Sequence, residues 1–526
     1  MNKIELYDTT LRDGAQSEGI SFSVSDKVKI CQRLDDLGID FIEGGWPGAN
    51  PKDMSFFKKA RAIGLKHASI VAFGSTRRAH TKASSDKVLK GLLNAGTRYV
   101  TIFGKSWDLH VREVFKVDLD ENIRMIEDSV KYLKSKGKKV FYDAEHFFDG
   151  YSSNKEYVLR TLRSAQDAGA ERIILCDTNG GTITSRIFDV VEEVKGVIST
   201  PLGIHAHNDC EMAVANSIAA VQAGCIQVQG TMNGYGERCG NANLVSIIAN
   251  LKLKLKLPSI SELALKELTE SARFVADVCN MKMQDGQPFV GSSAFAHKAG
   301  VHVNAVLKNP KTYEHVNPHM IGNHRRLLVS ELSGRSTILK KAEEMELGID
   351  KKSGESKKIL KILQEMEHNG YHFEAAEASM ELLIKRVMKK FKDFFDLEDF
   401  RVIIEKKKLG KTTSEAIIRL KVGKETEHTA ATGDGPVNAL DSALRKALKK
   451  FYPNLAGMRL IDYKVRVLDE KEGTAAKVRV LIQSHDKNDT WWTTGVSDDI
   501  IDASWKALVD SVEYKLLKDS SKKVPA

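Results

Sequence analysis

The chain has 526 residues, a length that exceeds a single hydrophobic core and predicts two or three domains. Its composition, 42% hydrophobic and 29% charged residues, is that of a globular protein, and its longest apolar runs are too short to cross a bilayer. The net charge of +10 is spread over helices in which lysine and glutamate are interspersed, so solvated helix faces explain it better than nucleic-acid binding.

The N-terminus and the cysteines predict a cytoplasmic protein. The chain opens on a strand-like run and shows no basic and then apolar signal segment. Six cysteines are scattered without CxxC spacing, which argues against a zinc ribbon or a disulfide framework and fits a reducing compartment. We therefore expect no membrane and no nucleic-acid partner.

Seven glycines punctuate the first half of the chain, and each is expected to end a helix and precede a short β-rich run. These glycines are Gly38, Gly64, Gly96, Gly137, Gly169, Gly196 and Gly224. With the opening run, the expected strands are 4–7, 41–43, 69–72, 99–102, 140–142, 173–175, 203–205 and 226–228. Strict alternation predicts a parallel sheet, and eight units in about 250 residues predict a closed (β/α)8 barrel, with an open doubly wound sheet as the alternative.

The pattern changes after residue 257. Charged amphipathic helices at 260–280, 334–347, 355–368 and 373–396, with a loop at 281–330, predict a helical linker over 258–397. Strands and helices then return, and we expect strands 400–405, 413–422, 458–467 and 476–484 and helices 435–451 and 498–517. The predicted fold class is α/β: a TIM barrel over 1–257, helical linker subdomains, an α/β domain over 398–518 and a polar tail over 519–526.

Polar residues stand at the exit of strand after strand, the end where barrel enzymes build their sites. Residues i and i+2 of a strand point the same way, so His205 and His207 are expected to face the barrel mouth together. With the carboxylate of Asp13 they predict a three-ligand divalent-metal site, to which Asn241 can add a carbonyl oxygen. The alternative is a histidine pair that is hydrogen-bonded without a metal.

Arg12 is expected to polarise a keto oxygen beside that metal and to hold the alkoxide that forms on attack; the alternative is an ion pair with Asp13 or Glu43. Asp143 and Glu145 also share one face, and crowding of two carboxylates raises one pKa, which suits proton transfer. The alternative is that one of these acids only orients Arg12.

Two further segments carry weaker signals. The glycine-rich segment 234–241 is not a GxGxxG phosphate loop and is expected to be a mobile loop at the barrel top, in which Cys239 has no neighbouring base. Segment 297–302 follows the barrel, and one of its histidines can reach back as a general base or can be a hydrogen-bonded loop residue.

Three motifs together resemble the acyl-CoA-dependent 2-oxoacid synthases of the barrel metal-dependent lyases, a family that includes isopropylmalate, homocitrate and citramalate synthases. The motifs are DTTLRDG at 8–14, HAHND at 205–209 and GERCGN at 236–241. Residues 433–440 and 495–504 resemble the C-terminal regulatory domain of isopropylmalate synthases. Segments 313–316, 322–323 and 329–335 resemble most the long form of citramalate synthase.

The resemblance implies that acetyl-CoA condenses with pyruvate and that the thioester is then hydrolysed, giving citramalate and CoA on the way to isoleucine. It implies a homodimer, a divalent cation (Zn, Mn or Mg) and a C-terminal domain that senses isoleucine. The implied metal ligands are Asp13, His205, His207 and Asn241, the implied 2-oxo acid site is lined by Gln16, Glu43, Asp143 and Thr178, and the implied catalytic residues are Arg12, Glu145, His302 and Tyr313.

The chain departs from the resemblance at two positions. Many relatives have an acid two residues after the histidine that His302 matches, but here the residue is Asn304, which places more of the proton transfer on Glu145. Asp143 is unexpected in a pocket for the methyl group of pyruvate.

Three alternative functions remain open from the sequence. A 2-isopropylmalate synthase would use 2-oxoisovalerate in place of pyruvate. A C–C lyase of the same superfamily would be little more than a barrel, and the additional 270 residues argue against it. A non-catalytic amino-acid sensor would not need the intact Arg12, Asp13, His205 and His207.

Overall fold

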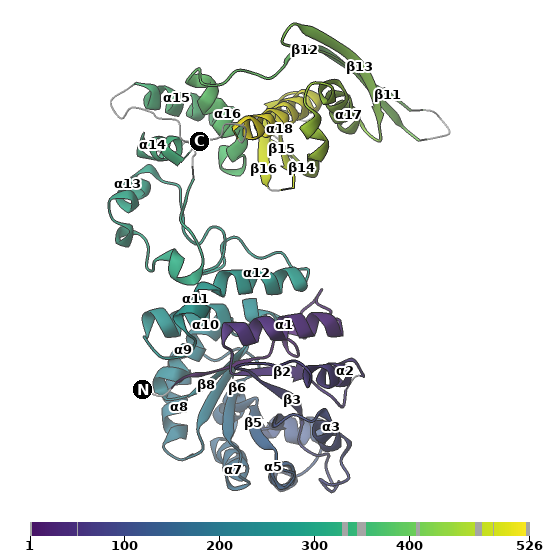
Figure 1. The fold of residues 1–526 in the computed structure, drawn as a ribbon. Helices are drawn as coiled ribbons and strands as arrows, with labels where there is room; N and C mark the ends of the chain where they lie inside the picture. Colours follow the sequence, from purple (N-terminus) through teal and green to yellow (C-terminus); the bar gives the residue numbers. More distant parts are fainter. Residues whose placement is uncertain are drawn as a thin grey trace. The chain divides into compact units, whose positions relative to one another are not determined.

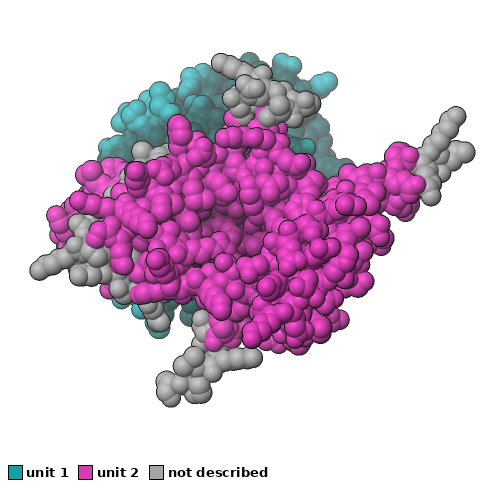
Figure 2. All heavy atoms as spheres, turned by 90° about the horizontal axis from the view of Figure 1, so that it is seen from above, with its two compact units in different colours: residues 1–295, 315–325 teal, residues 296–314, 326–526 magenta. Residues whose placement is uncertain are grey.

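A computed structural model describes residues 3–49, 51–328, 335–344, 354–406, 411–468, 476–487 and 489–521. The chain forms two compact units, residues 1–295 with 315–325 (unit 1) and residues 296–314 with 326–526 (unit 2), which are coloured separately in Figure 2. Of the sequence features above, the segment 329–334, the helix end at 345–347 and the tail at 522–526 lie outside the described residues.

Unit 1 is built around a closed barrel of eight parallel strands in chain order (Figure 1). Strand β1 closes the barrel on β8, with Leu6 opposite Val228. The strands are β1 (Glu5–Asp8), β2 (Phe41–Gly45), β3 (Ser69–Ser75), β4 (Tyr99–Lys105), β5 (Lys139–Glu145), β6 (Arg172–Asp177), β7 (Leu202–Ala206) and β8 (Gln227–Gly230). The predicted (β/α)8 barrel is therefore confirmed, and the open sheet is excluded.

Helices surround the strands and cover their outer face (Figure 1). In α1, the Ser23 side chain accepts a hydrogen bond from the backbone N–H of Asp26, and the Asp26 carboxylate accepts one from the backbone N–H of Ser23, a reciprocal cap that begins the helix. The helices of this layer are α1 (Val24–Leu37), α2 (Pro51–Ala60), α3 (Lys87–Ala95), α4 (Asp108–His110), α5 (Leu119–Ser135), α6 (Phe147–Ser153), α7 (Lys155–Asp167), α8 (Thr184–Lys195), α9 (Ala213–Ala223) and α10 (Leu244–Ala249).

The glycine pattern that predicted the helix ends holds at most, but not all, positions. Gly38 and Gly96 end α1 and α3 in the left-handed conformation, with φ of 86° and 73°. The same role for Gly64 is wrong because α2 ends four residues earlier, at Ala60. Gly196 does end α8, as predicted, but with φ of −70° it stays in the right-handed conformation.

The interior of the barrel is filled by side chains at its lower and middle levels. Tyr7, Phe41, Val71 and Phe141 form a buried cluster, and Tyr99 packs edge-on against Phe41 with ring centroids 5.1 Å apart. A filled interior leaves the carboxyl ends of the strands as the place where polar side chains can meet a ligand.

The segment after the barrel packs on unit 1. The helix predicted over 260–280 is two helices, α11 (Glu262–Lys266) and α12 (Leu268–Val278), which meet at Glu267. Leu268 is fully buried within the same hydrophobic cluster as the barrel helices. The end of the catalytic domain at residue 257 stays a prediction. The compact unit that contains the barrel continues to residue 295.

Unit 2 contains the remaining helices and two three-stranded antiparallel sheets, each followed by one long helix. The first half is β9 (Ala296–His297), α13 (Gly300–Lys308), β10 (Arg326–Leu327), α14 (Arg335–Glu344), α15 (Glu355–His368) and α16 (Glu377–Val387). The second half is β11 (Asp396–Glu405), β12 (Thr413–Val422), β13 (Glu425–Gly433), α17 (Pro436–Lys449), β14 (Arg459–Val467), β15 (Val478–His485), β16 (Thr490–Ser497) and α18 (Ile500–Ser521).

The second half of unit 2 is thus a repeat of three strands and a helix, which the sequence prediction missed. Strands β13 and β16 were not expected, because β13 is a polar run, ETEHTAATG, without a clear apolar face. The helix expected over 373–396 is wrong in extent, since α16 ends at Val387 and β11 already begins at Asp396. Lys389, with φ of 56°, lies just after that end and is incompatible with a continuing helix.

No helix among the described residues is both long enough and apolar enough to span a membrane.

Candidate metal centre and active site

Three potential metal ligands from distant parts of the sequence meet at the mouth of the barrel. Asp13 follows β1, His205 lies on β7, and His207 comes directly after β7. One ligand atom from each residue lies within 4.8 Å of the other two, and all three side chains are buried. The carboxylate Oδ2 of Asp13 is 3.2 Å from Nε2 of His205. The structure therefore brings together the three residues that the sequence predicted as ligands.

The electrostatics of Asp13 and His207 favour cation binding, whereas the pKa of His205 is raised because its hydrogen bond to Asp13 outweighs burial, so a cation displaces a proton there. Burial opposes the charge of Asp13, but the Arg12 charge and the hydrogen bond to His205 outweigh it and hold the pKa of Asp13 well below its usual range. Burial, with the neighbouring His205, lowers the pKa of His207 to about 3. Asp13 is therefore ionised and His207 neutral at physiological pH, which are the protonation states that metal ligands need.

Two buried atoms beside the cluster have no hydrogen-bond partner among the described residues, and a cation would supply one. They are Nδ1 of His207 and Oδ1 of Asn241. The amide nitrogen Nδ2 of Asn241 lies 2.9 Å from Asp13 Oδ2 and 3.2 Å from His205 Nε2, so turning the amide over would direct Oδ1 at the same ligand atoms. One carboxylate, two imidazoles and an amide oxygen suit Zn or Mn, so the residues fit the expected cation.

The glycine-rich segment 234–241 holds Asn241 in this position. A Cβ atom at Gly236 would lie 1.9 Å from Oδ1 of Asn241, so only glycine allows the amide to lie this close to the backbone. Arg238 ties the loop down by an ion pair of 2.8 Å to Asp209 and a hydrogen bond to the carbonyl of Thr178. Cys239 is exposed.

Arg12 adjoins the metal ligands and is held by contacts on three sides. Its Nη1 lies 3.3 Å from Asp13 Oδ1, and its Nε donates to Glu43 Oε1 at 2.6 Å. The guanidinium carbon lies 3.8 Å above the ring centroid of Phe73, and Tyr7 donates to the other oxygen of Glu43 at 2.5 Å. The ion pairs of Arg12 with Asp13 and Glu43, which were the alternative to a catalytic role, are both present. They orient a positive charge at the edge of the ligand cluster.

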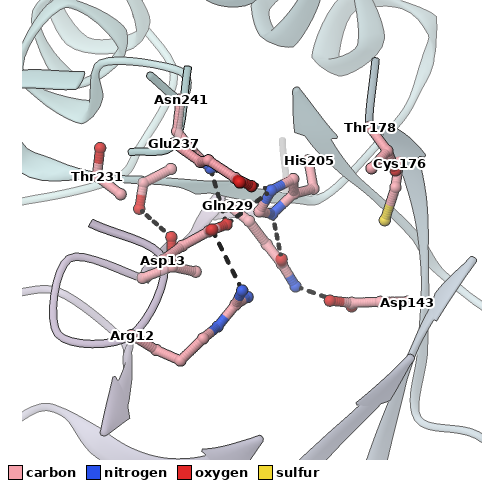
Figure 3. A network of polar contacts seen from close by, with 12 residues as sticks. Arg12, Asp13, Asp143, Cys176, Thr178, His205, Gln229, Thr231, Glu237 and Asn241 are labelled. Carbon is pink, nitrogen blue, oxygen red and sulfur yellow. Dashed lines mark hydrogen bonds and ion pairs between the residues drawn. The ribbon is translucent and has the colours of Figure 1, made fainter. Parts of the chain in front are cut away.

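A chain of hydrogen bonds continues from the cluster into the barrel (Figure 3). Nδ1 of His205 lies 2.8 Å from Oε1 of Gln229, and Nε2 of Gln229 donates to Oδ1 of Asp143 at 3.2 Å. Burial raises the pKa of Asp143 to about 7, and the nearby charge of Glu43 adds to the shift. The predicted crowding by Glu145 is therefore the wrong cause, although the direction of the pKa shift is right.

Gln229 is a site residue that the sequence reasoning missed. It is fully buried on β8, two residues after the equally buried Gln227. Two glutamines at i and i+2 in a strand as short as QVQG are the signal that could have identified it, because both must point to one side and need partners there.

The other predicted residues of unit 1 lie around this network. Glu145 ends β5 and forms an ion pair with Lys105. Oγ1 of Thr178 accepts a hydrogen bond of 2.9 Å from the backbone nitrogen of His146. Gln16 is exposed in the short 3-10 turn η1 (Gly14–Gln16) that follows Asp13. Their roles towards a substrate stay predictions.

His302 and Tyr313 belong to unit 2. Both side chains are exposed, and their rings are 4.3 Å apart between centroids. The other histidine of the predicted segment, His297, pairs with Glu314 at 3.2 Å, which matches the alternative of a hydrogen-bonded loop histidine. The role of His302 as a general base stays a prediction.

Comparisons with known families match almost the whole chain. Residues 3–275 match the HMGL-like family, residues 289–370 the homocitrate synthase post-HMGL domain-like family, and residues 374–516 the LeuA allosteric (dimerisation) domain.

Similar curated proteins fall into two groups. (R)-Citramalate synthases of Aquifex aeolicus and Geobacter sulfurreducens are 56% and 55% identical to the chain, with 98% of each chain covered in both cases. A probable 2-isopropylmalate synthase of Methanopyrus kandleri is 31% identical over 97% of this chain and 98% of its own.

Proposed function

The chain belongs to the HMGL-like family and, within it, to the long-form citramalate synthases, and from that premise we propose how it joins acetyl-CoA to pyruvate and releases citramalate and CoA. Identity of 44% to 56% to five citramalate synthases along nearly the full length carries this assignment. The 2-isopropylmalate synthase alternative rests on lower identity, 29% to 31%. The match to an allosteric domain over 374–516 leaves no basis for a lyase made of the barrel alone.

The metal site is proposed to consist of Asp13, His205 and His207, with Asn241 as a fourth ligand. A divalent cation held there would act as a Lewis acid on the 2-oxo group of pyruvate. The convergence of the three ligand atoms within 4.8 Å and the unpartnered amide oxygen of Asn241 support this assignment. The ionised Asp13 and the neutral His207 present lone pairs to the cation without prior proton loss.

Arg12 is proposed to bind the 2-oxo oxygen and to stabilise the negative charge that develops on it. Its guanidinium is fixed in advance by Glu43 and by the Phe73 ring, so it needs no reorganisation when the charge forms. Removing one such preorganised donor lowers kcat by about 10²- to 10³-fold in comparable sites.

The residues around Arg12 are proposed to hold the substrate, and in particular its carboxylate. Thr178 and Gln16 are the proposed contacts of the carboxylate, since both lie near strand exits and offer hydrogen-bond donors. Glu43 acts on the substrate through Arg12, because the hydrogen bonds from Arg12 and Tyr7 engage both of its oxygens.

Glu145, His302 and Tyr313 are proposed to remove the proton from the acetyl methyl group. Lys105 forms an ion pair with Glu145 and holds its carboxylate in place. The contact between the rings of His302 and Tyr313 supports their action as one unit. Because residue 304 is Asn, His302 lacks the nearby acid that the resemblance suggests, and Glu145 is proposed to take the larger share.

The bond changes balance without an added oxidant or reductant. The methyl carbon of acetyl-CoA loses one proton and attacks C2 of pyruvate, and the 2-oxo oxygen becomes the hydroxyl group of the product. Water then adds to the thioester carbonyl and the C–S bond breaks, which releases CoA as a thiol, leaves a carboxylate and frees one proton to the solvent.

We propose that isoleucine is the effector and that it binds the second half of unit 2. A cavity of about 740 Å³ is lined by residues of α17, β14 and the turn between them, including Asp441 and Arg445, which form an ion pair of 2.9 Å with each other, and the apolar Leu455 and Leu460. A bound amino acid would exchange this ion pair for contacts of its own ammonium and carboxylate groups with Asp441 and Arg445. Asp441→Asn is expected to weaken inhibition by isoleucine at least tenfold with unchanged basal activity. Glu398→Gln, at an exposed position of β11, serves as the control. An unchanged inhibition curve for Asp441→Asn would remove this pocket as the effector site.

A homodimer is proposed through the same region. Strands β11 and β14 are sheet edges and expose apolar side chains, with Ile404 and Ile461 more than half exposed at 56% and 53%. Exposed apolar edge strands favour pairing with a second chain.

One assay tests the activity and its substrate. The enzyme is mixed with acetyl-CoA, a divalent cation and either pyruvate, 2-oxoisovalerate or 2-oxoglutarate, and thiol release is followed. Release with pyruvate alone is expected. Release with 2-oxoisovalerate alone would make the enzyme a 2-isopropylmalate synthase, and no release with any 2-oxo acid would favour the non-catalytic sensor.

A further inference from the structure

We propose that Gln229 is a positioning residue that fixes the tautomer of His205 and thereby presents His205 Nε2 to the divalent cation, with Asp143 holding the Gln229 amide in place. The inference rests on the proposed metal site and concerns a residue outside the ligand set.

The proposal starts from the hydrogen bond at the inner nitrogen of His205. A neutral imidazole has one N–H donor and one lone pair, and its neighbours decide which nitrogen carries which. The group facing His205 Nδ1 is Oε1 of Gln229, at 2.8 Å, and an amide oxygen only accepts hydrogen bonds. The proton therefore resides on Nδ1.

In the neutral ring that binds a cation, the outer nitrogen then carries the lone pair, in place of the N–H that it donates to Asp13 when no cation is bound. Nε2 lies 3.2 Å from Oδ2 of Asp13, within the cluster of ligand atoms. In the opposite tautomer, the N–H would point at the cation and His205 could not serve as a ligand. Hydrogen bonds of this kind behind a ligating histidine are worth about 10- to 100-fold in metal affinity.

Asp143 determines which way the Gln229 amide points. Nε2 of Gln229 donates to Oδ1 of Asp143 at 3.2 Å, so the amide oxygen is left to face His205 (Figure 3). With the amide reversed, its nitrogen would face Nδ1 as a donor and would select the wrong tautomer. An acceptor oxygen at position 143 is sufficient for this purpose, whether the group is a carboxyl or an amide.

The two histidine ligands differ in this respect. Nδ1 of His207 is buried and has no hydrogen-bond partner in the part of the chain that the structure describes, so no described residue fixes its tautomer in the same way. His205, on β7, is therefore the histidine whose orientation is set before the cation arrives, and the neighbouring strand β8 supplies the group that sets it.

Gln227 provides a matched control for a merely structural role. It is the same residue type on the same strand, points to the same side as Gln229 and is equally buried. Its Nε2 donates to Oε2 of Glu5 at 3.0 Å, at the opposite end of the barrel from the metal site. Loss of this hydrogen bond perturbs the barrel core but leaves His205 unaffected.

The test measures binding of Co²⁺ to the metal-free enzyme, by titration and by the visible absorption of the bound ion. Gln229→Met keeps the length of the side chain but has no acceptor oxygen, and it is expected to bind Co²⁺ about 10- to 100-fold more weakly with an altered spectrum. Gln229→Glu retains an acceptor for Nδ1–H and is expected to keep the wild-type affinity within threefold, as are Asp143→Asn and Gln227→Met.

Three results would overturn the proposal: wild-type affinity and spectrum in Gln229→Met, an equal loss in Gln227→Met, or an equal loss in Gln229→Glu. If Gln229→Met does not fold, Gln229→Asn takes its place, because its amide is one methylene shorter and cannot reach Nδ1; wild-type affinity there counts against the proposal in the same way. Absence of Co²⁺ binding by the wild-type enzyme would instead overturn the metal site itself.

Discussion

The burial of Asp143 leads to a prediction about how the free energy of unfolding depends on pH. Its pKa is raised to about 7 in the folded protein, mainly by burial, against an ordinary value of 3.8. The unfolded chain therefore loses this proton first, and the free energy of unfolding falls as the pH rises from about 4 to about 7. Above pH 7 the full penalty, about 4 kcal/mol for a shift of about three units, is present.

Replacing Asp143 by Asn removes this penalty because the amide does not ionise. About 3 kcal/mol of the penalty develops between pH 5 and pH 8, so the variant should gain that much relative to the wild type over this range. For a unit of about 300 residues, with an unfolding entropy of about 2.1 cal/mol/K per residue, the gain corresponds to a rise in Tm of about 4–5 °C.

The assay is scanning calorimetry of the metal-free wild type and Asp143→Asn at pH 5 and pH 8. The transition of unit 1 is identified as the one that added divalent cation moves upward, since a ligand stabilises the unit that binds it. Any pH-independent effect of the substitution, such as a changed hydrogen bond to Gln229, cancels when the Tm difference at pH 5 is subtracted from that at pH 8. Equal differences at the two pH values would refute the assignment of a raised pKa to Asp143.

Three further predictions concern other groups of the barrel. Burial opposes ionisation of Glu121, but hydrogen bonds from His80, Arg77 and Arg124 lower its pKa to about 2, so Glu121 stabilises the fold above pH 4.5 and loses this effect as the pH falls towards 2. Glu121→Gln should therefore lower Tm at pH 7 by several degrees and leave it unchanged at low pH. A change in Tm that does not depend on pH in calorimetry would contradict this. Arg12→Lys keeps the charge, but the lysine cannot reach Glu43 and Asp13 together. We expect kcat to fall by about 10²-fold while the Co²⁺ affinity changes less than threefold. A fall in Co²⁺ affinity as large as the fall in kcat would argue against a role of Arg12 in the transition state. Treatment with a chelator should abolish thiol release, and added Zn, Mn or Mg should restore it; full turnover after dialysis against chelator, with metal content checked by elemental analysis, would exclude the cation from the reaction.

The barrel could be predicted because its signals are local and repeated. Each βα unit is recognisable in the sequence by an amphipathic run and a short apolar strand. Eight such units in series are compatible with few folds other than a closed barrel. The proposed metal ligands followed, because residue parity predicted that His205 and His207 face one side, and closure of the barrel brings β1, with Asp13 after it, to within one strand of β7. Of the two missed strands of unit 2, β13 lacks this local signal, because it depends on pairing with β12 and on α17 for its place in the sheet. Strand β16, TWWTTGVS, does carry a β-rich run, which the sequence prediction overlooked.

What the sequence could not provide was the choice of partner for each buried polar group. Glu43 and Glu145 were both available to interact with Asp143 or Arg12, and only the three-dimensional arrangement assigns Glu43 to Arg12 and Glu145 to Lys105. Gln229 was missed for the same reason: a glutamine in a strand has no distinctive pattern, and its importance comes from the two atoms its amide meets, 24 and 86 residues away.

The position of Asp143 resolves a conflict that the sequence raised. A charged carboxylate is a poor neighbour for the methyl group of pyruvate, but burial raises the pKa of Asp143 to about 7, so the group is substantially protonated at neutral pH. Its oxygen Oδ1 is engaged by Gln229, and the like charge of Glu43 further opposes ionisation. Asp143 can therefore orient the amide behind His205 without placing a full negative charge in the pocket. The same arrangement keeps Asp13 and Glu43 in contact with Arg12, so that Arg12 and Asp13 are the charges that a 2-oxo acid would meet in the proposed site.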